Sequence, residues 1–318
     1  MATLKEKRTC GQRCEDFGHF VWNSDEGKFM GRTPIRWLYI SLYYVAFYVV
    51  MTALFSLAIY VLMYTLDPYK PDYQDRLKSP GVMVWPDTYD DEELEITYNM
   101  SDKNNWMTKS KILQDFLEPY NDTIQAQCNH YNCTSGKYFI QHAFDAPKHT
   151  KWSCPFYQSM LGNCSGIDDP TFGYNTAQPC VIIKMNRIIN FLPNNGTGSA
   201  PYVNCTALVS VDHISRWMSN TDMTDKPNLK RVCLQEGQDN VRGYTYYPAN
   251  GTLDLSYFPY YGKLAQPTYM NPLVAVKLDL VNQRHAVIQC RVMANNIAHQ
   301  NYYDPYEGKV IFHLTALS

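Results

Sequence analysis

The most prominent pattern in the sequence is a run of thirty residues without a charged side chain, from Trp37 to Leu66. Because about 20 apolar residues in a helix cross the hydrocarbon core of a bilayer, this run predicts one membrane-spanning helix. A cleaved signal peptide would have a shorter apolar core, closer to the terminus. No second run of comparable length follows, so the pattern separates a tail of residues 1–36 and a span of residues 37–66 from the rest.

The segment after the span begins with a stretch rich in proline and charge, residues 67–86, which is typical of an extended stalk. Further on, residues 108–120 place apolar side chains at helical spacing and reach Pro119. This spacing predicts a short amphipathic helix that ends near the proline. Residues 87–318 are then expected to form one folded domain.

Toward the C-terminus, apolar and polar residues alternate in three stretches, 274–280, 288–292 and 310–314. A period of two with one apolar face predicts half-buried antiparallel strands. The Asn250-Gly251 pair lies between two strand-like flanks and predicts a hairpin with a primed turn. Cys290 lies on an apolar strand face, where a disulfide between two sheets would brace a sandwich. The expected architecture is one all-β sandwich with loop insertions.

Charge predicts the orientation of the span. The tail carries seven Lys and Arg residues, and Arg32 and Arg36 lie against the membrane, whereas Asp67 follows the far end of the span. The positive-inside rule therefore places the N-terminus in the cytoplasm. The large segment contains seven Asn-x-Ser/Thr sequons and the tail none, which predicts N-glycosylation of an exterior domain at Asn99, Asn121, Asn132, Asn163, Asn195, Asn204 and Asn250.

Cysteine usage agrees with an exterior location. Eight of the ten cysteines lie in the large segment, and an even number in an oxidising compartment predicts disulfides. The spacing alone leaves 105 complete pairings open. Cys10 and Cys14 lie in the tail and are expected to be reduced.

The composition and motifs argue against several functional classes. With 45% hydrophobic residues and a net charge of −2, the chain has no basic footprint for nucleic acid. It contains no HExxH, GxSxG, P-loop or GxGxxG motif. A zinc site of His130, His142 or His149 with Cys128 and Cys133 is conceivable, but exterior cysteines at such spacings are more often oxidised. We therefore expect no enzyme activity, no cofactor and no metal.

Two groups of aromatic residues remain unexplained by a soluble sandwich. Residues 257–277 are rich in tyrosine and proline, and tyrosine is enriched at protein interfaces, although burial in the core is the alternative. Tyrosines also lie deep in the span, where a hydroxyl needs a partner and polar groups join membrane helices. The predicted contacts with a partner are Tyr43, Tyr44, Phe47 and Tyr48 in the span, and Tyr257, Phe258, Tyr260 and Tyr261 outside.

Three stretches have a distinctive sequence. The first is "FGHFVWN" followed by "GRTPIRW" at the membrane entry, the second is "KWSCPFYQSMLGNCSG" (residues 151–166), and the third is "YFPYYGK" with "NPLVAVK". Together they resemble signatures of the β subunit of the P-type Na,K- and H,K-ATPases. The sequences of the segments "SLYYVAFYVVMT" and "DPYKPDYQDRLKSPGV" are most similar to the gastric H,K branch of the family.

The resemblance implies a single-pass type II plasma-membrane glycoprotein, apical in the gastric branch, with an immunoglobulin-like ectodomain. Its partner would be the catalytic α subunit, in an αβ heterodimer or a higher oligomer. It implies no catalysis by this chain, but folding and delivery of α, support of K⁺ occlusion and stabilisation of the phosphorylated pump. The implied disulfides join Cys133 with Cys154, Cys164 with Cys180, and Cys205 with Cys290.

Two cysteines and two functional alternatives stay open. Cys128 and Cys233 have no counterpart in the three-disulfide pattern, and we predict that they form a fourth bridge. An Na,K-type β subunit is an alternative to the H,K type. A type II cell-surface adhesion glycoprotein is equally consistent with a glycosylated β ectodomain.

Overall fold

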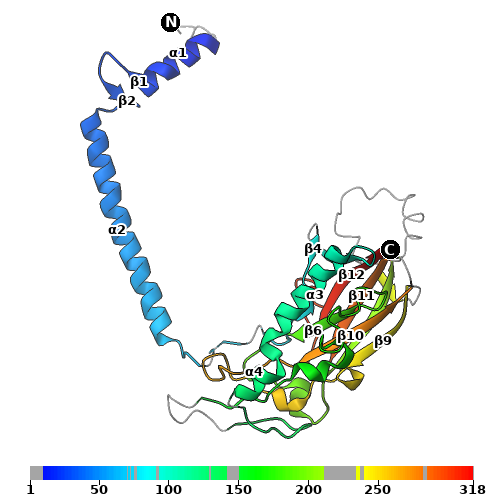
Figure 1. The fold of residues 1–318 in the computed structure, drawn as a ribbon. Helices are drawn as coiled ribbons and strands as arrows, with labels where there is room; N and C mark the ends of the chain where they lie inside the picture. The colour runs from blue at the N-terminus through cyan, green and yellow to red at the C-terminus, as the bar shows by residue number, and fades with distance from the viewer. Residues whose placement is uncertain are drawn as a thin grey trace. The chain divides into compact units, whose positions relative to one another are not determined.

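The computed structural model describes most of the chain, and the secondary structure falls into two units. The described residues are 10–69, 71, 73–74, 77–90, 93–128, 130–141, 150–210, 234–236, 240–281 and 285–317. The N-terminal unit is Met1–Leu66 and the C-terminal unit is Asp67–Ser318. Figure 1 shows a long helix in the first unit and packed sheets in the second.

The N-terminal unit is built around one long helix. Helix α1 (Cys10–Val21) leads into a small hairpin of β1 (Trp22–Asn23) and β2 (Lys28–Phe29), and α2 (Pro34–Thr65) follows. Proline is favoured in the first turn of a helix, which explains why α2 begins three residues before the uncharged run. Its 32 residues extend about 48 Å at 1.5 Å per residue. In the described part of the chain it is the one helix long and apolar enough to cross a membrane.

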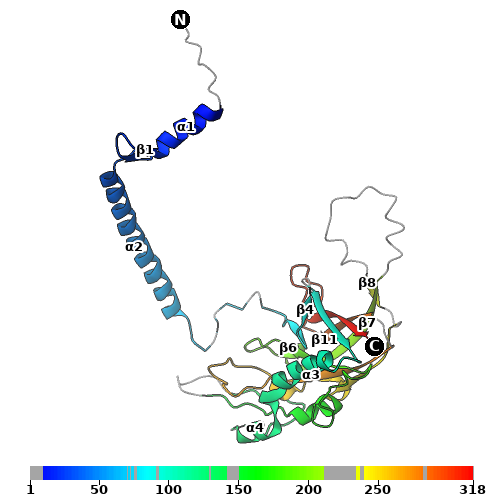
Figure 2. The same cartoon turned by 45° about the horizontal axis from the view of Figure 1, so that its top comes forward.

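The C-terminal unit contains two β-sheets among its described residues. The smaller sheet has the order β3-β6-β10-β9, with strands β3 (Val82–Trp85), β6 (Cys180–Met185), β10 (Leu273–Leu280) and β9 (Val241–Tyr247). The larger sheet has the order β4-β5-β12-β11-β7-β8, with β4 (Tyr89–Asp90), β5 (Glu93–Asn99), β12 (Lys309–Leu317), β11 (His285–Met293), β7 (Tyr202–Ser210) and β8 (Leu234–Glu236). Figure 2 shows these strands from a second direction.

The three alternating stretches of the sequence form β10, β11 and β12, as predicted. The described strand pairs are antiparallel with one exception, because β12 runs parallel to β5 and pairs Leu314 with Ile96. Antiparallel pairing suits strands that bury one face and leave the other toward solvent. The prediction that the segment after the apolar helix is rich in β-strands is therefore confirmed.

The core lies where the apolar strand faces of the two sheets meet. Val84 and Val276 of the smaller sheet are fully buried, as are Ile96 and Phe312 of the larger one, and all four belong to one hydrophobic cluster. One hydrogen bond joins the sheets directly, because the backbone N–H of Cys205 donates to the hydroxyl of Tyr246 at 3.0 Å. Side chains from both sheets thus fill a single core.

Helix α3 (Lys103–Leu117) covers the other face of the smaller sheet. It includes residues 108–117 of the predicted amphipathic stretch, whose last three residues form the 3₁₀ helix Glu118–Tyr120. The helix begins earlier than predicted, after Asp102, whose carboxylate accepts the N–H of Asn104 at 3.0 Å as an N-cap. Leu113 is fully buried, and the ring of Phe116 stacks on Trp85 of β3 with 4.4 Å between centroids. The helix is therefore part of the packed structure.

Short helical turns connect these elements. They are helix α4 (Asp122–Gln127) and the 3₁₀ helices Glu118–Tyr120, Gln158–Cys164, Pro193–Gly196, Ala249–Gly251 and Leu255–Tyr257.

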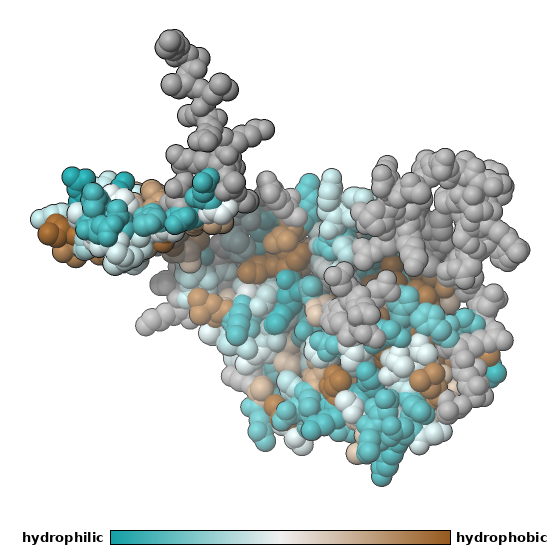
Figure 3. Space-filling view, turned by 90° about the horizontal axis from the view of Figure 1, so that it is seen from above, coloured by the Kyte–Doolittle hydropathy of each residue, from teal (hydrophilic) through white to brown (hydrophobic). Residues whose placement is uncertain are grey.

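On the face shown in Figure 3, hydrophilic residues predominate over the C-terminal unit and hydrophobic residues occur in small groups.

The predicted hairpin at Asn250-Gly251 is wrong. Strand β9 pairs with β10, and the residues after the turn leave this sheet, since Thr252 bridges Tyr202 and the N–H of Leu253 donates to Pro201 at 2.8 Å. A Cβ atom on Gly251, whose φ is +66°, would lie 2.8 Å from the carbonyl oxygen of Val203. The Asn-Gly pair therefore carries the chain from one sheet to the other, where only glycine fits.

The predicted disulfide between sheets is also wrong in its placement. Cys205 and Cys290 are direct partners on the neighbouring strands β7 and β11 of the larger sheet, with Cα atoms 4.0 Å apart. Both side chains point to the buried face because each residue occupies an apolar position in its strand. The bridge therefore fastens two strands of one sheet.

The predicted stalk is shorter than residues 67–86, because Val82–Trp85 form β3 inside the smaller sheet. The alternating burial of Val82 and Val84 explains this assignment. The acidic stretch that follows contributes to the β4–β5 pair, with Asp90 opposite Glu93.

Replacing Leu113 by alanine tests whether α3 is integral to the C-terminal unit. Removing a fully buried leucine should lower the free energy of unfolding by about 2–5 kcal/mol, because the transfer energy is lost and a cavity remains. Thermal unfolding of the purified chain, followed by near-UV circular dichroism, measures the effect. Lys111→Ala, on the exposed face of the same helix, is the control and should change stability by less than about 0.5 kcal/mol. Equal effects of the two substitutions would contradict the packing.

Candidate functional site

Four aromatic rings form a continuous ladder along α2. Tyr43 stacks on Phe47 with 6.4 Å between ring centroids, and Tyr44 stacks on Tyr48 at 6.2 Å. Edge contacts of 5.6 Å join the two pairs, Tyr43 to Tyr44 and Phe47 to Tyr48. The spacing of four residues brings each pair onto the same side of the helix. The structure thus brings together all four residues that the sequence predicted in the span.

Three residues of this ladder carry a hydroxyl group. Tyr43, Tyr44 and Tyr48 are exposed, and within the described residues their hydroxyls have no hydrogen-bond partner. In the hydrocarbon core, where water is absent, such a hydroxyl costs free energy unless it finds a donor or an acceptor. The ladder is therefore suited to contact with another membrane helix.

The start of α2 is fastened to the hairpin before it. The indole N–H of Trp37 donates to the carbonyl oxygen of Phe29 at 2.8 Å, and the two rings lie 5.8 Å apart. The guanidinium carbon of Arg32 lies 5.9 Å from the centroid of the Trp37 ring, within the range of a cation–π contact. The "GRTPIRW" stretch thus builds a local structure at the end of the helix.

The second predicted contact group lies in the interior of the C-terminal unit. Tyr257, Phe258, Tyr260 and Tyr261 each expose 8% or less of their surface. This corrects the prediction that their side chains form a surface for a partner, and favours the alternative of a core role. The physical reason is that the hydroxyls of Tyr257 and Tyr261 find hydrogen-bond partners within the fold.

The hydroxyls of these tyrosines join distant parts of the chain. Tyr257 donates to the carbonyl oxygen of Pro155 at 2.9 Å, and Tyr261 accepts the N–H of Gln141 at 2.8 Å. Burial raises the pKa of both phenols, which keeps them neutral. The Arg187 guanidinium lies 5.3 Å from the centroid of the Tyr260 ring. These contacts fasten residues 257–261 to segments near 141, 155 and 187.

Asp254 anchors the start of the same stretch. Its carboxylate accepts the N–H of Ser256 at 2.8 Å and the N–H of Gly136 at 3.1 Å, and it is also hydrogen-bonded to the Ser135 hydroxyl. Burial acts to raise the pKa of Asp254, but these hydrogen bonds favour the charged form more strongly, and the pKa lies below its ordinary value. Sequence reasoning missed this residue, because no local pattern indicates partners 118 and 119 positions away.

The exposed part of the stretch is the turn that follows the aromatic residues. Leu264 is 57% exposed and Lys263 is also exposed. A backbone hydrogen bond fixes the turn to another segment of the chain, since the N–H of Lys151 donates to the carbonyl oxygen of Ala265 at 2.7 Å. An exposed leucine on a fixed turn is the part of this stretch that another protein can reach.

The structure contains three disulfides among its described residues: Cys133–Cys154, Cys164–Cys180 and Cys205–Cys290. These are the pairs that the family resemblance implies. Cys128 has a free thiol, and Cys233 lies outside the described residues. The pairing of Cys128 with Cys233 therefore stays a prediction.

The seven sequons are spread over the C-terminal unit. Asn99 is half-buried at the end of β5, and the remaining six asparagines are exposed: Asn121, Asn132, Asn163, Asn195, Asn204 and Asn250. Each of these side chains can carry a glycan without entering the core.

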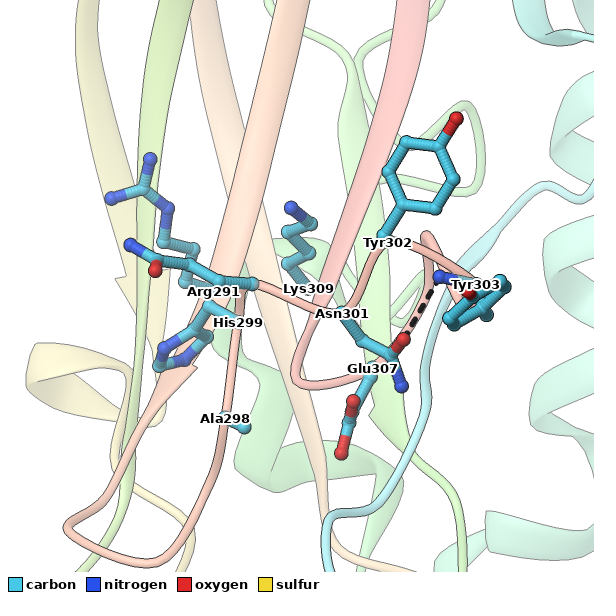
Figure 4. A pocket seen from close by; sticks show the side chains of 9 residues that line it. Arg291, Ala298, His299, Asn301, Tyr302, Tyr303, Glu307 and Lys309 are labelled. Atoms are coloured by element: carbon cyan, nitrogen blue, oxygen red, sulfur yellow. Dashed lines mark hydrogen bonds between the residues drawn. The ribbon is translucent and has the colours of Figure 1, made fainter.

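One cleft of about 730 Å³ lies where β11 ends and β12 begins (Figure 4). Arg291 and Lys309, opposite each other on the two strands, line it together with Glu307, His299 and other residues of the connecting loop. Burial and the charge of Arg291 lower the pKa of Lys309. His299 is hydrogen-bonded to the Val292 carbonyl oxygen at 2.9 Å. None of the residues predicted from the sequence lines this cleft.

The described residues contain no group of three or more His, Cys, Asp or Glu side chains that could hold a metal ion. Cys133, which could have been a zinc ligand, is oxidised in a disulfide with Cys154. The features of this chain that point to function are therefore the ladder on α2 and the fastened turn at Leu264.

Comparison with known proteins identifies relatives along nearly the whole chain. The family described as "Sodium / potassium ATPase beta chain" matches residues 7–312. The chain is 51% identical over 315 residues to the potassium-transporting ATPase subunit beta of Oryctolagus cuniculus and to that of Homo sapiens. Each alignment covers 99% of this chain and 99% of the relative. The sodium/potassium-transporting ATPase subunit beta-2 of Mus musculus is 41% identical over 316 residues, 99% of this chain and 98% of the relative.

The anchoring role of Asp254 predicts a pH-dependent stability. A carboxylate whose folded pKa lies below its unfolded value stabilises the fold above the unfolded pKa, and this stabilisation is lost as the pH falls through the folded pKa. Asp254→Asn should therefore unfold at a lower temperature than the unmodified chain, by an equal margin at pH 7 and pH 5. The margin should shrink below about pH 4.

Asp254→Ala is the matched comparison for this experiment. Alanine also removes the acceptor of the Ser256 N–H, so it should cost about 0.5–2 kcal/mol in total, more than asparagine does. A margin for Asp254→Asn that stays unchanged at pH 3 would show that the charge has no part in the anchor.

Proposed function

The chain belongs to the family of sodium/potassium ATPase beta chains, and we propose that it is the accessory β subunit of a P-type ATPase that exchanges H⁺ for K⁺. The observation that carries this proposal is the 51% identity to potassium-transporting β subunits over 99% of both chains. The identity to the Na⁺/K⁺-transporting beta-2 subunit is lower, at 41%. An Na,K-type role is the alternative, and sequencing of the catalytic subunit that copurifies with the native protein distinguishes the two.

We further infer a type II orientation at the plasma membrane, in its apical part where the cell is of gastric type. The tail of residues 1–36 is then cytoplasmic, α2 crosses the bilayer, and residues 67–318 lie outside. Supporting observations are the basic residues before α2, the seven sequons after it and the three disulfides. The exterior unit is a variant of an immunoglobulin-like sandwich, in which two sheets share one core.

The partner is the catalytic α subunit, in an αβ heterodimer. The aromatic ladder of Tyr43, Tyr44, Phe47 and Tyr48 packs against membrane helices of α, whose polar groups bond the tyrosine hydroxyls. Outside the membrane, the exposed turn at Leu264 contacts α, and the buried aromatic residues 257–261 hold this turn in place. The ladder thus determines where α2 binds, and the turn adds an exterior contact.

The proposed consequences of this assembly are structural. A chain that covers apolar and polar surface of α stabilises its folded state, because a ligand that binds the native form shifts the folding equilibrium toward it. Delivery of α to the cell surface follows from this stabilisation. A β subunit that binds one pump conformation more tightly also favours that conformation, which would account for support of K⁺ occlusion and of the phosphorylated state. The chain itself carries out no catalysis in this proposal.

Removing the hydroxyls of the ladder tests the membrane contact. Tyr44→Phe with Tyr48→Phe keeps both rings and deletes only the hydroxyl groups. Hydrogen bonds between membrane helices contribute about 0.6–1.7 kcal/mol each, so the double variant should bind α roughly tenfold or more weakly. The amount of α that copurifies with the tagged chain in mild detergent measures the effect.

The control for this experiment is Tyr64→Phe. Tyr64 lies in the last turn of α2, at a depth where tyrosine hydroxyls reach the interface and need no protein partner. Its loss should leave the yield of α unchanged. Replacement of Tyr44 and Tyr48 by leucine, which removes the rings as well, should reduce the yield further. A full yield of α with both double variants would exclude the ladder as the contact.

Thiol labelling of intact cells tests the orientation. Cys14 is exposed and free, so a membrane-impermeant maleimide should label it only after the plasma membrane is permeabilised. Peptide mass spectrometry identifies the labelled cysteines. Labelling of Cys14 on intact cells would contradict the type II orientation. The same digest tests the fourth bridge, because Cys128 and Cys233 are protected if they are joined and labelled from outside if they are free.

A further inference from the structure

Three of the seven sequons have cysteine as their middle residue. They are Asn132-Cys133-Thr134, Asn163-Cys164-Ser165 and Asn204-Cys205-Thr206. Each of these cysteines belongs to a different one of the three disulfides. Every disulfide in the described structure therefore has one end inside a glycosylation sequon.

The order along the chain is also the same in all three cases. The sequon cysteine is always the first of its pair, and its partner follows 21 residues later for Cys133, 16 residues later for Cys164 and 85 residues later for Cys205. A chain that emerges from its N-terminal side thus presents each of these sequons before the disulfide can close.

At Asn204 and Asn163 the folded structure leaves room for the glycan but not for its transfer, whereas Asn132 and Thr134 of the third sequon are exposed in an irregular segment. Asn204 is exposed on β7 while Cys205 beside it is buried, because neighbouring residues of a strand point to opposite faces. The same residues are held by strand pairing in the larger sheet, where Asn204 of β7 lies opposite Arg291 of β11. A glycosyltransferase must bind the sequon as a separate extended strand, and the closed sheet prevents this.

The second of these sequons is closed in a different way. Asn163 and Cys164 lie in the 3₁₀ helix Gln158–Cys164, and Cys164 is fully buried in its bond to Cys180. Ser165, whose hydroxyl completes the sequon, is only 2% exposed. An enzyme that reads this hydroxyl cannot reach it once the disulfide has formed.

The other four sequons have no such constraint. Their middle residues are Met100, Asp122, Gly196 and Gly251, none of which can form a covalent bridge. These sequons lie at the end of a helix or strand or in turns. For example, Asn121 caps helix α4, where its side chain accepts the N–H of Thr123 at 2.9 Å. Asn250 lies in the 3₁₀ turn Ala249–Gly251. They serve as internal references for the three cysteine-containing sites.

We propose that glycosylation at Asn132, Asn163 and Asn204 competes with disulfide closure, so that each of these sites is modified before its cysteine is oxidised or not at all. The proposal rests on the exterior placement of residues 67–318 given above. In one reaction the Asn Nδ2 atom takes an oligosaccharide from a lipid pyrophosphate carrier, and the lipid pyrophosphate leaves. In the other, two thiols lose two electrons and two protons to a disulfide oxidant of the secretory compartment, which becomes a dithiol.

The sequence separations set the time available to each site. At a synthesis rate of about 5–20 residues per second, the partner cysteine emerges about 1–3 s after Cys164, about 1–4 s after Cys133 and about 4–17 s after Cys205. When glycan transfer is slow, Asn163 and Asn132 should be modified least, and Asn204 should resemble the four reference sites.

The experiment slows glycan transfer and removes one disulfide at a time. Cells expressing the full chain are treated with a dose of glycosylation inhibitor at which Asn250 is about half occupied, and glycopeptide mass spectrometry measures each site on the total pool of chains. Cys180→Ser keeps the Asn163 sequon intact and abolishes only its disulfide. It should reduce the unoccupied fraction at Asn163 at least twofold, and Cys154→Ser should do the same at Asn132.

The remaining sites separate this effect from misfolding. Cys180→Ser should leave the glycan occupancy of Asn132 unchanged, and Cys154→Ser should leave that of Asn163 unchanged. A general delay in folding would instead raise the occupancy of both sites in either variant. Cys290→Ser should change the unoccupied fraction at Asn204 by less than twofold, because the time between the emergence of Cys205 and that of Cys290 is already long. Occupancy at Asn163 and Asn132 that does not respond to loss of the partner cysteine, or that rises equally at all sites, overturns the proposal. Absence of glycan at all seven sequons without inhibitor would instead refute the exterior placement itself.

Discussion

A polar group that is removed from water costs free energy unless it finds a hydrogen-bond partner, and tyrosine hydroxyls in the two units meet this constraint differently. In the C-terminal unit, the buried hydroxyl of Tyr98 donates to the Thr176 carbonyl oxygen at 3.0 Å, and that of Tyr174 donates to Cys180 at 3.1 Å. The hydroxyls on α2 have no such partner within the described chain. Once α2 lies in a membrane, as proposed above, a second protein would have to supply the partners of these hydroxyls.

Local patterns in the sequence were sufficient to predict some of the regular elements, but not β3 to β7 or the helices α1 and α4. The alternation in β10, β11 and β12, the helical spacing in α3 and the uncharged run of α2 each depend on residues within about ten to thirty positions. In each case the hydrophobic effect selects one face, or for α2 the whole surface, for removal from water. The ladder on α2 could be predicted for the same reason, because a spacing of four residues fixes which rings meet on a helix.

Features that depend on strand register and on distant contacts could not be predicted. The sequence indicated that Cys290 faces the core, but only the pairing of β7 with β11 shows that its partner lies in the same sheet. Asn250-Gly251 has the composition of a hairpin turn, yet the residues after it pair with β7 across the core. Tyrosine suits both interfaces and cores, so residues 257–261 could be assigned only once partners such as Pro155 were known.

The burial of this aromatic stretch limits which of its residues a partner can contact. The turn at Leu264 depends on contacts of residues 254–261 with Gly136, Pro155 and Arg187, which come from three separate parts of the chain. None of these contacts is local in sequence, so the shape of the turn depends on the folding of the C-terminal unit. In the proposed assembly, a catalytic subunit that binds this turn would select chains whose C-terminal unit is complete. The contact at the turn would then report the folding of that unit, whereas the ladder on α2 would bind independently of it.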